Sequence, residues 1–145
     1  MSDRPELVGL THTGVLAAIH GAAFPRDEVW SERAIAELLA TPGVLGWLHP
    51  AGGMILTWVV ADEAEILTLA VAPPVRRRGI ARGLLGAAIA EFSRLGIMSV
   101  FLEVSAANVA ARALYATLGF SAVGERPHYY SDGATALLMK FSFCE

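Results

Sequence analysis

One stretch, Ile66 to Leu85, limits the folds open to this chain more than any other. An apolar run from Ile66 to Val71 stops at Pro73-Pro74, and Arg76-Arg77-Arg78, Gly79 and a helical pattern follow. This order predicts a strand, a tight basic loop and a helix start. The first N–H groups of a helix are unpaired and carry partial positive charge, so they attract phosphate. Since Gly79 lets a ligand approach the backbone closely, the stretch predicts a seat for a phosphate-bearing ligand.

Two common phosphate-binding motifs are missing from this stretch. No Gly-Lys-Ser/Thr follows, which argues against a Walker loop, and no GxGxxG is present, which argues against a dinucleotide enzyme. The alternative is an ordinary solvated loop that precedes a helix. Three arginines, a glycine and a helix start together favour the binding role.

The rest of the composition narrows the class of protein. With a net charge of −3, the arginines form a local patch on a mildly acidic chain of 145 residues, which argues against general nucleic-acid binding. A single cysteine, Cys144, allows no internal disulfide and suits a reducing compartment. The N-terminus lacks an apolar signal segment, and the longest apolar run, Gly52 to Ala61, is too short to span a bilayer. We expect a soluble cytoplasmic protein of one domain, residues 1–145, with no membrane partner.

Hydrophobic periodicity and turn residues predict an alternating order of elements. Strands are expected near residues 5–10, 43–49, 54–60, 65–71, 99–104, 120–123 and 136–143. Helices are expected from a cap at Thr11 or Thr13 to residue 23, after a cap at Ser31, from 80 to 95 and from 108 to 118. The strands at 65–71 and 99–104 are joined through a helix and should be parallel. The fold class is therefore α/β (α+β), with a mixed, mostly antiparallel sheet, a central parallel pair and helices on both faces.

Ligands of open α/β sheets bind beyond the carboxyl ends of the parallel strands, and here that edge holds Val71, Glu103 and the loops after them. Glu103 lies within the apolar run Val100 to Val104, where a charge is costly unless it faces an edge, a partner or a site. It is either a general base whose pKa is raised by apolar surroundings or an outward-facing strand residue. The spacing alone favours neither interpretation.

The helix that follows the Glu103 strand carries a second candidate. Asn108, Ala111, Arg112 and Tyr115 lie at steps of three and four, on one helical face. Tyr115 is positioned to donate a proton to a leaving group, although a lone tyrosine more often packs with its hydroxyl at the surface. Its place one short loop after the strand favours a role in a site.

Other residue types give weaker indications. The four histidines show no metal-ligand spacing, so we expect no metal site. Cys144 is too close to the chain end for a nucleophile held in a triad, and Ser105 lacks the nucleophile-elbow context. Trp30, Tyr129 and Tyr130 fall in predicted loops, where they either join the core or contact a substrate.

The motif Arg76-Arg77-Arg78-Gly79-Ile80-Ala81 resembles the Arg/Gln-x-x-Gly-x-Gly/Ala signature of the GCN5-related N-acetyltransferases, and the element order matches that family over nearly the whole chain. Within the family the chain is most similar to the ribosomal-protein-alanine N-acetyltransferases, the RimI type. The stretches that carry this likeness are Ala23-Phe24-Pro25, Trp30-Ser31, Leu69-Ala70-Val71, Leu102-Glu103-Val104, Asn108, Ala113-Leu114-Tyr115, Leu118-Gly119-Phe120 and Arg126-Pro127-His128-Tyr129-Tyr130.

The resemblance implies acetyl-CoA as donor and the N-terminal amine of a protein, in this group a ribosomal protein, as acceptor. It assigns the backbone of Leu69 to Val71 to the pantetheine arm, Arg77 to Arg82 to the pyrophosphate, Glu103 to the base and Tyr115 to the acid. The full set of expected donor-binding residues is Leu69, Ala70, Val71, Arg76, Arg77, Arg78, Gly79, Ile80, Ala81, Arg82 and Asn108. The expected acceptor-binding residues are Trp30, Tyr129 and Tyr130.

The sequence departs from the family pattern at two places. Ala81 stands where the family often has glycine, which the signature permits. Ala134-Thr135 replaces a Glu-Asp pair that the RimI type commonly carries, which puts the acceptor preference in doubt but not the donor. Acetylation of a small amine, an amino acid or a lysine side chain stays open as an alternative. A non-catalytic acetyl-CoA-binding module is disfavoured because Glu103 and Tyr115 are both present.

Overall fold

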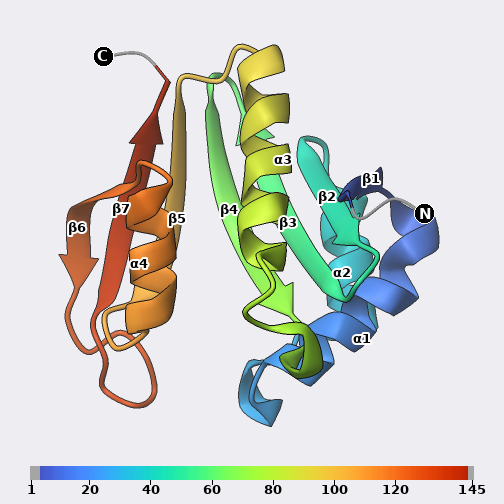
Figure 1. The fold of residues 1–145 in the computed structure, drawn as a ribbon, viewed down its shortest axis with the longest axis horizontal. Coiled ribbons are helices and arrows are strands. Elements are labelled where there is room, and N and C mark those ends of the chain that lie inside the picture. Colours follow the sequence, from blue (N-terminus) through green and yellow to red (C-terminus); the bar gives the residue numbers. More distant parts are fainter. Residues whose placement is uncertain (1–3, 144–145) are drawn as a thin grey trace.

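A computed structural model describes residues 4–143, which form a seven-stranded sheet in the order β1-β2-β3-β4-β5-β7-β6 (Figure 1). The strands are β1 (Glu6–Val8), β2 (Val44–His49), β3 (Gly53–Val60), β4 (Glu63–Val71), β5 (Ser99–Ser105), β6 (Ser121–Arg126) and β7 (Ala136–Ser142). The helices are α1 (Thr13–Ala23), α2 (Glu32–Leu39), α3 (Ile80–Arg94) and α4 (Val109–Thr117), with short 3-10 turns at Leu10–His12, Arg26–Glu28 and Pro73–Val75.

The two faces of the sheet are covered by different helices, as expected for this fold class. Helices α1 and α2 bury one cluster, which includes Leu16, Ile35 and Leu56. Helices α3 and α4 bury the larger cluster on the other face, which includes Leu84 and Phe92. The sheet is mixed and mostly antiparallel, with β4 and β5 as its parallel pair. The predicted fold class is therefore confirmed.

The parallel pair is short, and this decides where a site can form. Strands β4 and β5 pair only through Glu63↔Ser99, Ala64↔Val100 and Glu65↔Phe101. Just beyond, the β3–β4 register shifts, since Leu56 pairs with Thr68 and Thr57 with Ile66, which leaves Leu67 as the extra residue of a bulge. Beyond Glu65, no strand of the described chain pairs with the β5-facing edge of β4. The backbone groups of that edge are consequently available to a ligand.

The helix starts confirm two expected caps and correct a third. Ser31 Oγ accepts a hydrogen bond from the Ala34 N–H at 3.0 Å, and Asn108 Oδ1 accepts one from the Ala111 N–H at 3.1 Å. The expectation that Thr11 or Thr13 caps α1 is wrong. The N-cap is His12, with no side-chain cap, and the Thr13 hydroxyl instead donates to the Leu10 carbonyl at 2.7 Å. The 3-10 turn at Leu10–His12 runs directly into α1 and takes the place of a side-chain cap.

Helix α3 lies close against the sheet because of one glycine. A Cβ at Gly53 would stand 2.5 Å from Ile80 Cγ2 and 2.9 Å from Leu84 Cδ1, so a larger residue would push the helix away from β3. This contact fixes the start of α3 beside the end of β4. Within residues 4–143, none of the helices has both the length and the apolar character needed to cross a membrane.

Candidate active site

A cavity of about 710 Å³ lies between the end of β4, the start of α3, and α4. We name it the basic cavity. It brings together every donor-binding residue expected from the sequence except Arg78. Its lining residues are Ala23, Phe24, Pro25, Glu28, Leu69, Ala70, Val71, Arg76, Arg77, Gly79, Ile80, Ala81, Arg82, Asn108, Ala110, Ala111, Leu114 and Tyr115.

The loop before α3 leaves the first backbone N–H groups of the helix without a side-chain cap. Arg77 and Gly79 have left-handed backbone, with φ of 68° and 77°. This conformation is uncommon for a residue other than glycine, and such residues cluster at functional sites. No side chain caps α3, and its first backbone hydrogen bond runs from the Gly83 N–H to the Gly79 carbonyl at 3.0 Å. A Cβ at Gly79 would meet nothing within 4 Å, so the helix start faces open space. The geometry suits an anion.

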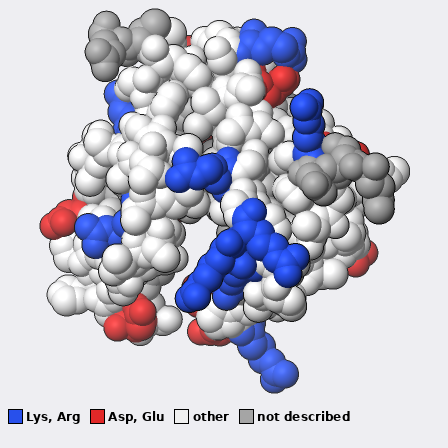
Figure 2. All heavy atoms as spheres, in the orientation of Figure 1, with Lys and Arg blue, Asp and Glu red and all other residues white. Residues whose placement is uncertain are grey.

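The arginines of this loop serve different ends. Arg76 Nε donates to the Val71 carbonyl at 3.1 Å and its Nη2 donates to the Ala23 carbonyl at 3.0 Å, so this side chain fastens the end of β4 to the end of α1. Arg82 Nη2 donates to Thr117 Oγ1 at 3.0 Å and joins α3 to α4. Figure 2 shows Lys and Arg side chains gathered over the lower end of α3, beside a hollow in this face. The patch predicted from the sequence therefore exists in space.

A second cavity, of about 640 Å³, opens beside the first, and we name it the aromatic cavity. It contains Glu103, Tyr115 and all three expected acceptor-binding residues. Its lining residues are His20, Phe24, Glu28, Trp30, Glu65, Ile66, Leu67, Thr68, Leu69, Glu103, Val104, Ser105, Asn108, Tyr115, Tyr129, Tyr130, Ser131 and Asp132. The two cavities share five residues, namely Phe24, Glu28, Leu69, Asn108 and Tyr115. The junction lies where β4 and β5 have separated.

Tyr115 is the buried residue at that junction, with 9% of its surface exposed. Burial, with a smaller contribution from Tyr130, raises the pKa of Tyr115 to about 12. Because its pKa is about 12, the Tyr115 hydroxyl is protonated at neutral pH. Within residues 4–143 the hydroxyl has no hydrogen-bond partner, and no fully buried side-chain oxygen in this range lacks one. The hydroxyl oxygen is therefore not fully buried and is accessible from the cavities.

Glu103 faces away from the core and into the aromatic cavity. Its strand neighbours Leu102 and Val104 are buried on the α3–α4 side, whereas Glu103 is exposed. Arg126 Nε lies 3.5 Å from Glu103 Oε2, and the same guanidinium lies over the Tyr129 ring, 5.3 Å from its centroid. Burial first, and then the Glu103 charge, raise the pKa of Tyr130. The Glu103 carboxylate thus lies close to the aromatic loop between β6 and β7, with Arg126 in contact with both.

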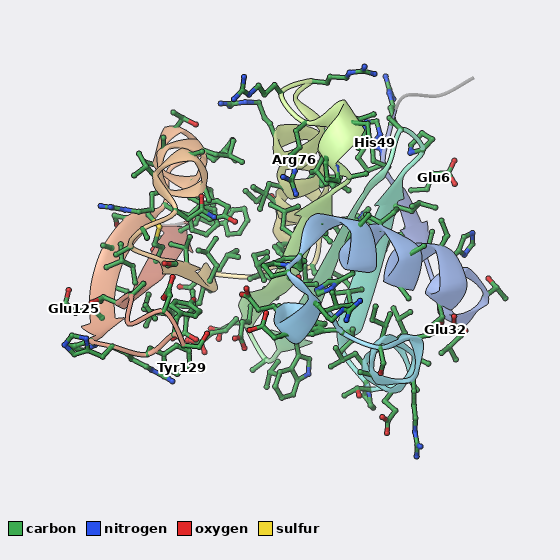
Figure 3. The ribbon with its side chains drawn as sticks, turned by 90° about the horizontal axis from the view of Figure 1, so that it is seen from below. Glu6, Glu32, His49, Arg76, Glu125 and Tyr129 are labelled. Carbon is green, nitrogen blue, oxygen red and sulfur yellow. The ribbon has the colours of Figure 1, made fainter. Side chains whose placement is uncertain are left out.

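Figure 3 shows that the residues of the basic cavity and of the aromatic cavity come from different parts of the fold. Arg76 lies beside the start of α3, whereas Tyr129 lies on the side of β6 and β7. Neither Arg126 nor Glu28 is among the site residues expected from the sequence, and the histidines, His20 included, are considered there only as metal ligands. The signal for Arg126 was its place in the Arg-Pro-His-Tyr-Tyr stretch, while nothing in the sequence pointed to Glu28.

The structure also bears on two residues considered as nucleophiles, Ser105 and Cys144, and on the question of a metal site. The Ser105 hydroxyl accepts a hydrogen bond from the Ala107 N–H at 3.2 Å, which is a turn contact. Cys144 lies outside the described residues. Among residues 4–143, no three His, Cys, Asp or Glu side chains group as metal ligands do.

Comparison with known proteins places this geometry among acetyltransferases. A family model described as the acetyltransferase (GNAT) family matches residues 16–120. The [ribosomal protein bS18]-alanine N-acetyltransferase of Escherichia coli K12 is 38% identical over 133 residues, covering 86% of this chain and 87% of that protein. The N-alpha-acetyltransferase RimI of Mycobacterium tuberculosis is 34% identical, covering 86% and 82%. A crystal structure of the ribosomal-protein-S18-alanine N-acetyltransferase from E. coli superposes with a TM-score of 0.85 at 31% identity, covering 97% and 95% of the two chains.

Proposed function

The chain belongs to the acetyltransferase (GNAT) family and is an acetyl-CoA-dependent N-acetyltransferase, and from that premise we propose that its acceptor is the N-terminal alanine of a small-subunit ribosomal protein. The observation that carries the proposal is the junction of the two cavities at Tyr115. One cavity offers backbone and arginines to a phosphate-bearing donor. The other offers a carboxylate and aromatic side chains to an acceptor. The acceptor identity rests on the likeness to the two bacterial N-terminal acetyltransferases.

The basic cavity fits the chemistry of acetyl-CoA. The uncapped start of α3 and the open space at Gly79 suit a pyrophosphate, with Arg77, Arg78 and Arg82 adding positive charge. The free edge of β4 at Leu69 to Val71, apart from the Val71 carbonyl that Arg76 engages, offers backbone groups to the amides of the pantetheine arm. Arg76 contributes by holding this edge in place. Its Nε and Nη2 already donate hydrogen bonds to backbone carbonyls, so these two atoms are not available to acetyl-CoA.

Glu103 acts as the base. An N-terminal amine has a pKa of about 7.7–8.0, so at neutral pH most of it must lose a proton before it attacks. Glu103 takes that proton through a water molecule in the aromatic cavity. The amine nitrogen then bonds to the acetyl carbon, the carbon–sulfur bond breaks, and the remaining excess proton on the nitrogen passes through water to the departing thiolate, so that the amide and the free thiol are released. Direct attack needs no covalent enzyme intermediate, and the alignment of two bound reactants supplies a large part of the rate.

Tyr115 serves the leaving group. Its hydroxyl stays protonated, since its pKa is about 12. It donates a hydrogen bond to the sulfur as the thiolate forms. A thiol has a pKa of about 8.5, so complete transfer from so weak an acid is unfavourable. The hydrogen bond itself is then the main contribution, and Tyr115 should matter less to the rate than Glu103 does.

An acetyl-transfer screen tests the acceptor. Hexapeptides that differ only in the first residue would be assayed beside free lysine and a polyamine, with release of free thiol as the readout. We expect the peptide that begins with alanine to give the highest kcat/KM. Faster transfer to lysine or the polyamine would overturn the acceptor assignment in favour of a small-amine acetyltransferase, and would leave the donor assignment intact.

A further inference from the structure

His20 is a buried histidine that the proposed mechanism does not use. It lies in the last turn of α1, only 1% exposed, and lines the aromatic cavity. Its ring stacks on Phe24 with centroids 4.3 Å apart, and on Trp30 with centroids 5.0 Å apart. Both ring nitrogens are engaged: Nδ1 lies 3.2 Å from the Trp30 backbone nitrogen and Nε2 lies 3.2 Å from Thr68 Oγ1. Both nitrogens of this buried ring are therefore satisfied, and each ties α1 to a different segment of the chain.

These partners fix the protonation state of the ring. A backbone N–H can only donate, so Nδ1 of His20 must accept and carries no proton. The neutral imidazole then has its proton on Nε2, which donates to the Thr68 hydroxyl. Burial lowers the pKa of His20 and favours the same neutral form. His20 therefore holds one donor and one acceptor in fixed directions.

The two hydrogen bonds join parts of the chain that build the cavity. Thr68 follows the bulge of β4, at the level where β4 and β5 separate. Trp30 lies near the end of the segment between α1 and α2, residues 24–31, which also places Phe24 and Glu28 in the cavity walls. The segment contains only one short 3-10 turn, Arg26–Glu28. Its position over β4 thus depends on what fastens it there.

We propose that His20 is a positioning residue for the acceptor: as a neutral imidazole protonated on Nε2, it fastens the 24–31 segment to β4 and so sets the wall against which the acceptor binds. This inference rests on the proposed function for its acceptor. It requires the Trp30 N–H to Nδ1 hydrogen bond specifically, not merely a side chain that fills the space. That requirement separates it from a structural role.

Two nearly isosteric substitutions test it. In His20→Asn the side-chain oxygen replaces Nδ1 as an acceptor for the Trp30 N–H, whereas His20→Leu has a similar shape and no acceptor. We expect KM for an alanine-first hexapeptide to be roughly five-fold higher in His20→Leu than in His20→Asn, which is the size expected for one hydrogen bond. We expect KM for acetyl-CoA to be equal in the two variants. If His20 only packs, leucine should serve at least as well as asparagine in so buried a site, and that result would overturn the proposal.

Two measurements on the protein without acceptor keep the proposal testable even if the peptide is no substrate or a variant does not fold. In the wild-type protein with ¹⁵N-labelled histidine, NMR should show His20 with a protonated Nε2 and a bare Nδ1 at pH 7. Hydrogen exchange at the Trp30 amide should be roughly five-fold slower in wild type than in His20→Leu, with His20→Asn between them. A proton on Nδ1 would overturn the proposal. If the peptide screen fails while both signals are as expected, the acceptor assignment is wrong but the role of His20 in fixing the segment holds.

Discussion

The basic and aromatic cavities meet at Tyr115, yet they are built in different ways. The basic cavity takes most of its polar lining from one stretch of sequence, Leu69 to Arg82, with α4 and residues 23–28 as its other walls. The aromatic cavity takes its residues from α1, the 24–31 segment, β4, β5, α4 and the loop between β6 and β7. A site built mostly from one stretch is set largely by local conformation, whereas a site built from several distant segments depends on how they pack. The acceptor side should therefore be the more sensitive to substitutions that change packing, and the donor side to changes in one loop.

The sharpest test of this division is Glu103→Gln, which removes the proposed base and keeps the shape of the aromatic cavity. We expect kcat to fall about 10³-fold, within the range for loss of general base catalysis. The dissociation constant for acetyl-CoA, measured by calorimetry, should change little because Glu103 does not line the basic cavity. Near-normal turnover would remove Glu103 from the mechanism. Glu65→Gln, which also lines the aromatic cavity, is the matched control and should retain most of the activity.

Tyr115→Phe tests the buried residue among the five that both cavities share. We expect kcat to fall about 10²-fold, at the low end for a proton donor, because the pKa of about 12 makes Tyr115 a weak acid. In the wild-type enzyme, kcat should not decline between pH 8 and about 10 through ionisation of this tyrosine, since its pKa lies above that range. Equal rates for the variant and wild type at every pH would exclude the role.

Arg76→Ala tests whether the loop that carries the basic cavity is held by a side chain. Loss of its two hydrogen bonds to carbonyls should lower the free energy of unfolding by about 1–2 kcal/mol in urea titrations. Arg78→Ala should have less effect on stability, since Arg78 has no hydrogen bond or ion pair within the described chain. If Arg78→Ala destabilises as much as Arg76→Ala does, the fastening role of Arg76 is wrong.

The smallest expected effect concerns pH and the aromatic cavity. The pKa of His20 is lowered by burial, so between its folded value and the ordinary value near 6.5 the unfolded chain binds more protons than the folded one. The stability of the wild type should therefore decrease as pH falls through about 6.5, relative to that of His20→Asn. Chemical unfolding at pH 7.5 and pH 5.5 measures the difference. An identical pH dependence in the two proteins would mean that His20 keeps its ordinary pKa.

Local signals in the sequence predicted much of the fold. The Pro-Pro stop, the arginines and Gly79 predicted the strand-to-helix loop, and Ser31 and Asn108 predicted two helix caps by the chemistry of their side chains. The cap expected at Thr11 or Thr13 was wrong because a 3-10 turn begins α1 instead. The single domain, the cellular location and the roles of individual site residues stay predictions.

The candidate site divides in the same way. The expected donor residues, apart from Asn108, could be grouped in advance because they lie within one short stretch of the chain, and a helix start suited to an anion is a local feature. For Glu103, the sequence left a base and an outward-facing residue equally open, since strand periodicity gives the face of a side chain but not what lies opposite. Glu28 could not be identified at all, because its only link to the site is the packing of the 24–31 segment.

The sequence by itself determined the element order, the parallel pair and the basic loop between β4 and α3, since these follow from periodicity, turn residues and backbone chemistry over short spans. Only the tertiary structure decided that β4 and β5 separate after Glu65, that a bulge at Leu67 accompanies this, and that Tyr115 closes the junction. The physical reason is that strand register and separation depend on contacts between residues far apart in the chain. Ile66 to Leu85 thus specifies the strand, the basic loop and the helix start that line the basic cavity, while the packing of distant segments shapes the aromatic cavity beside it.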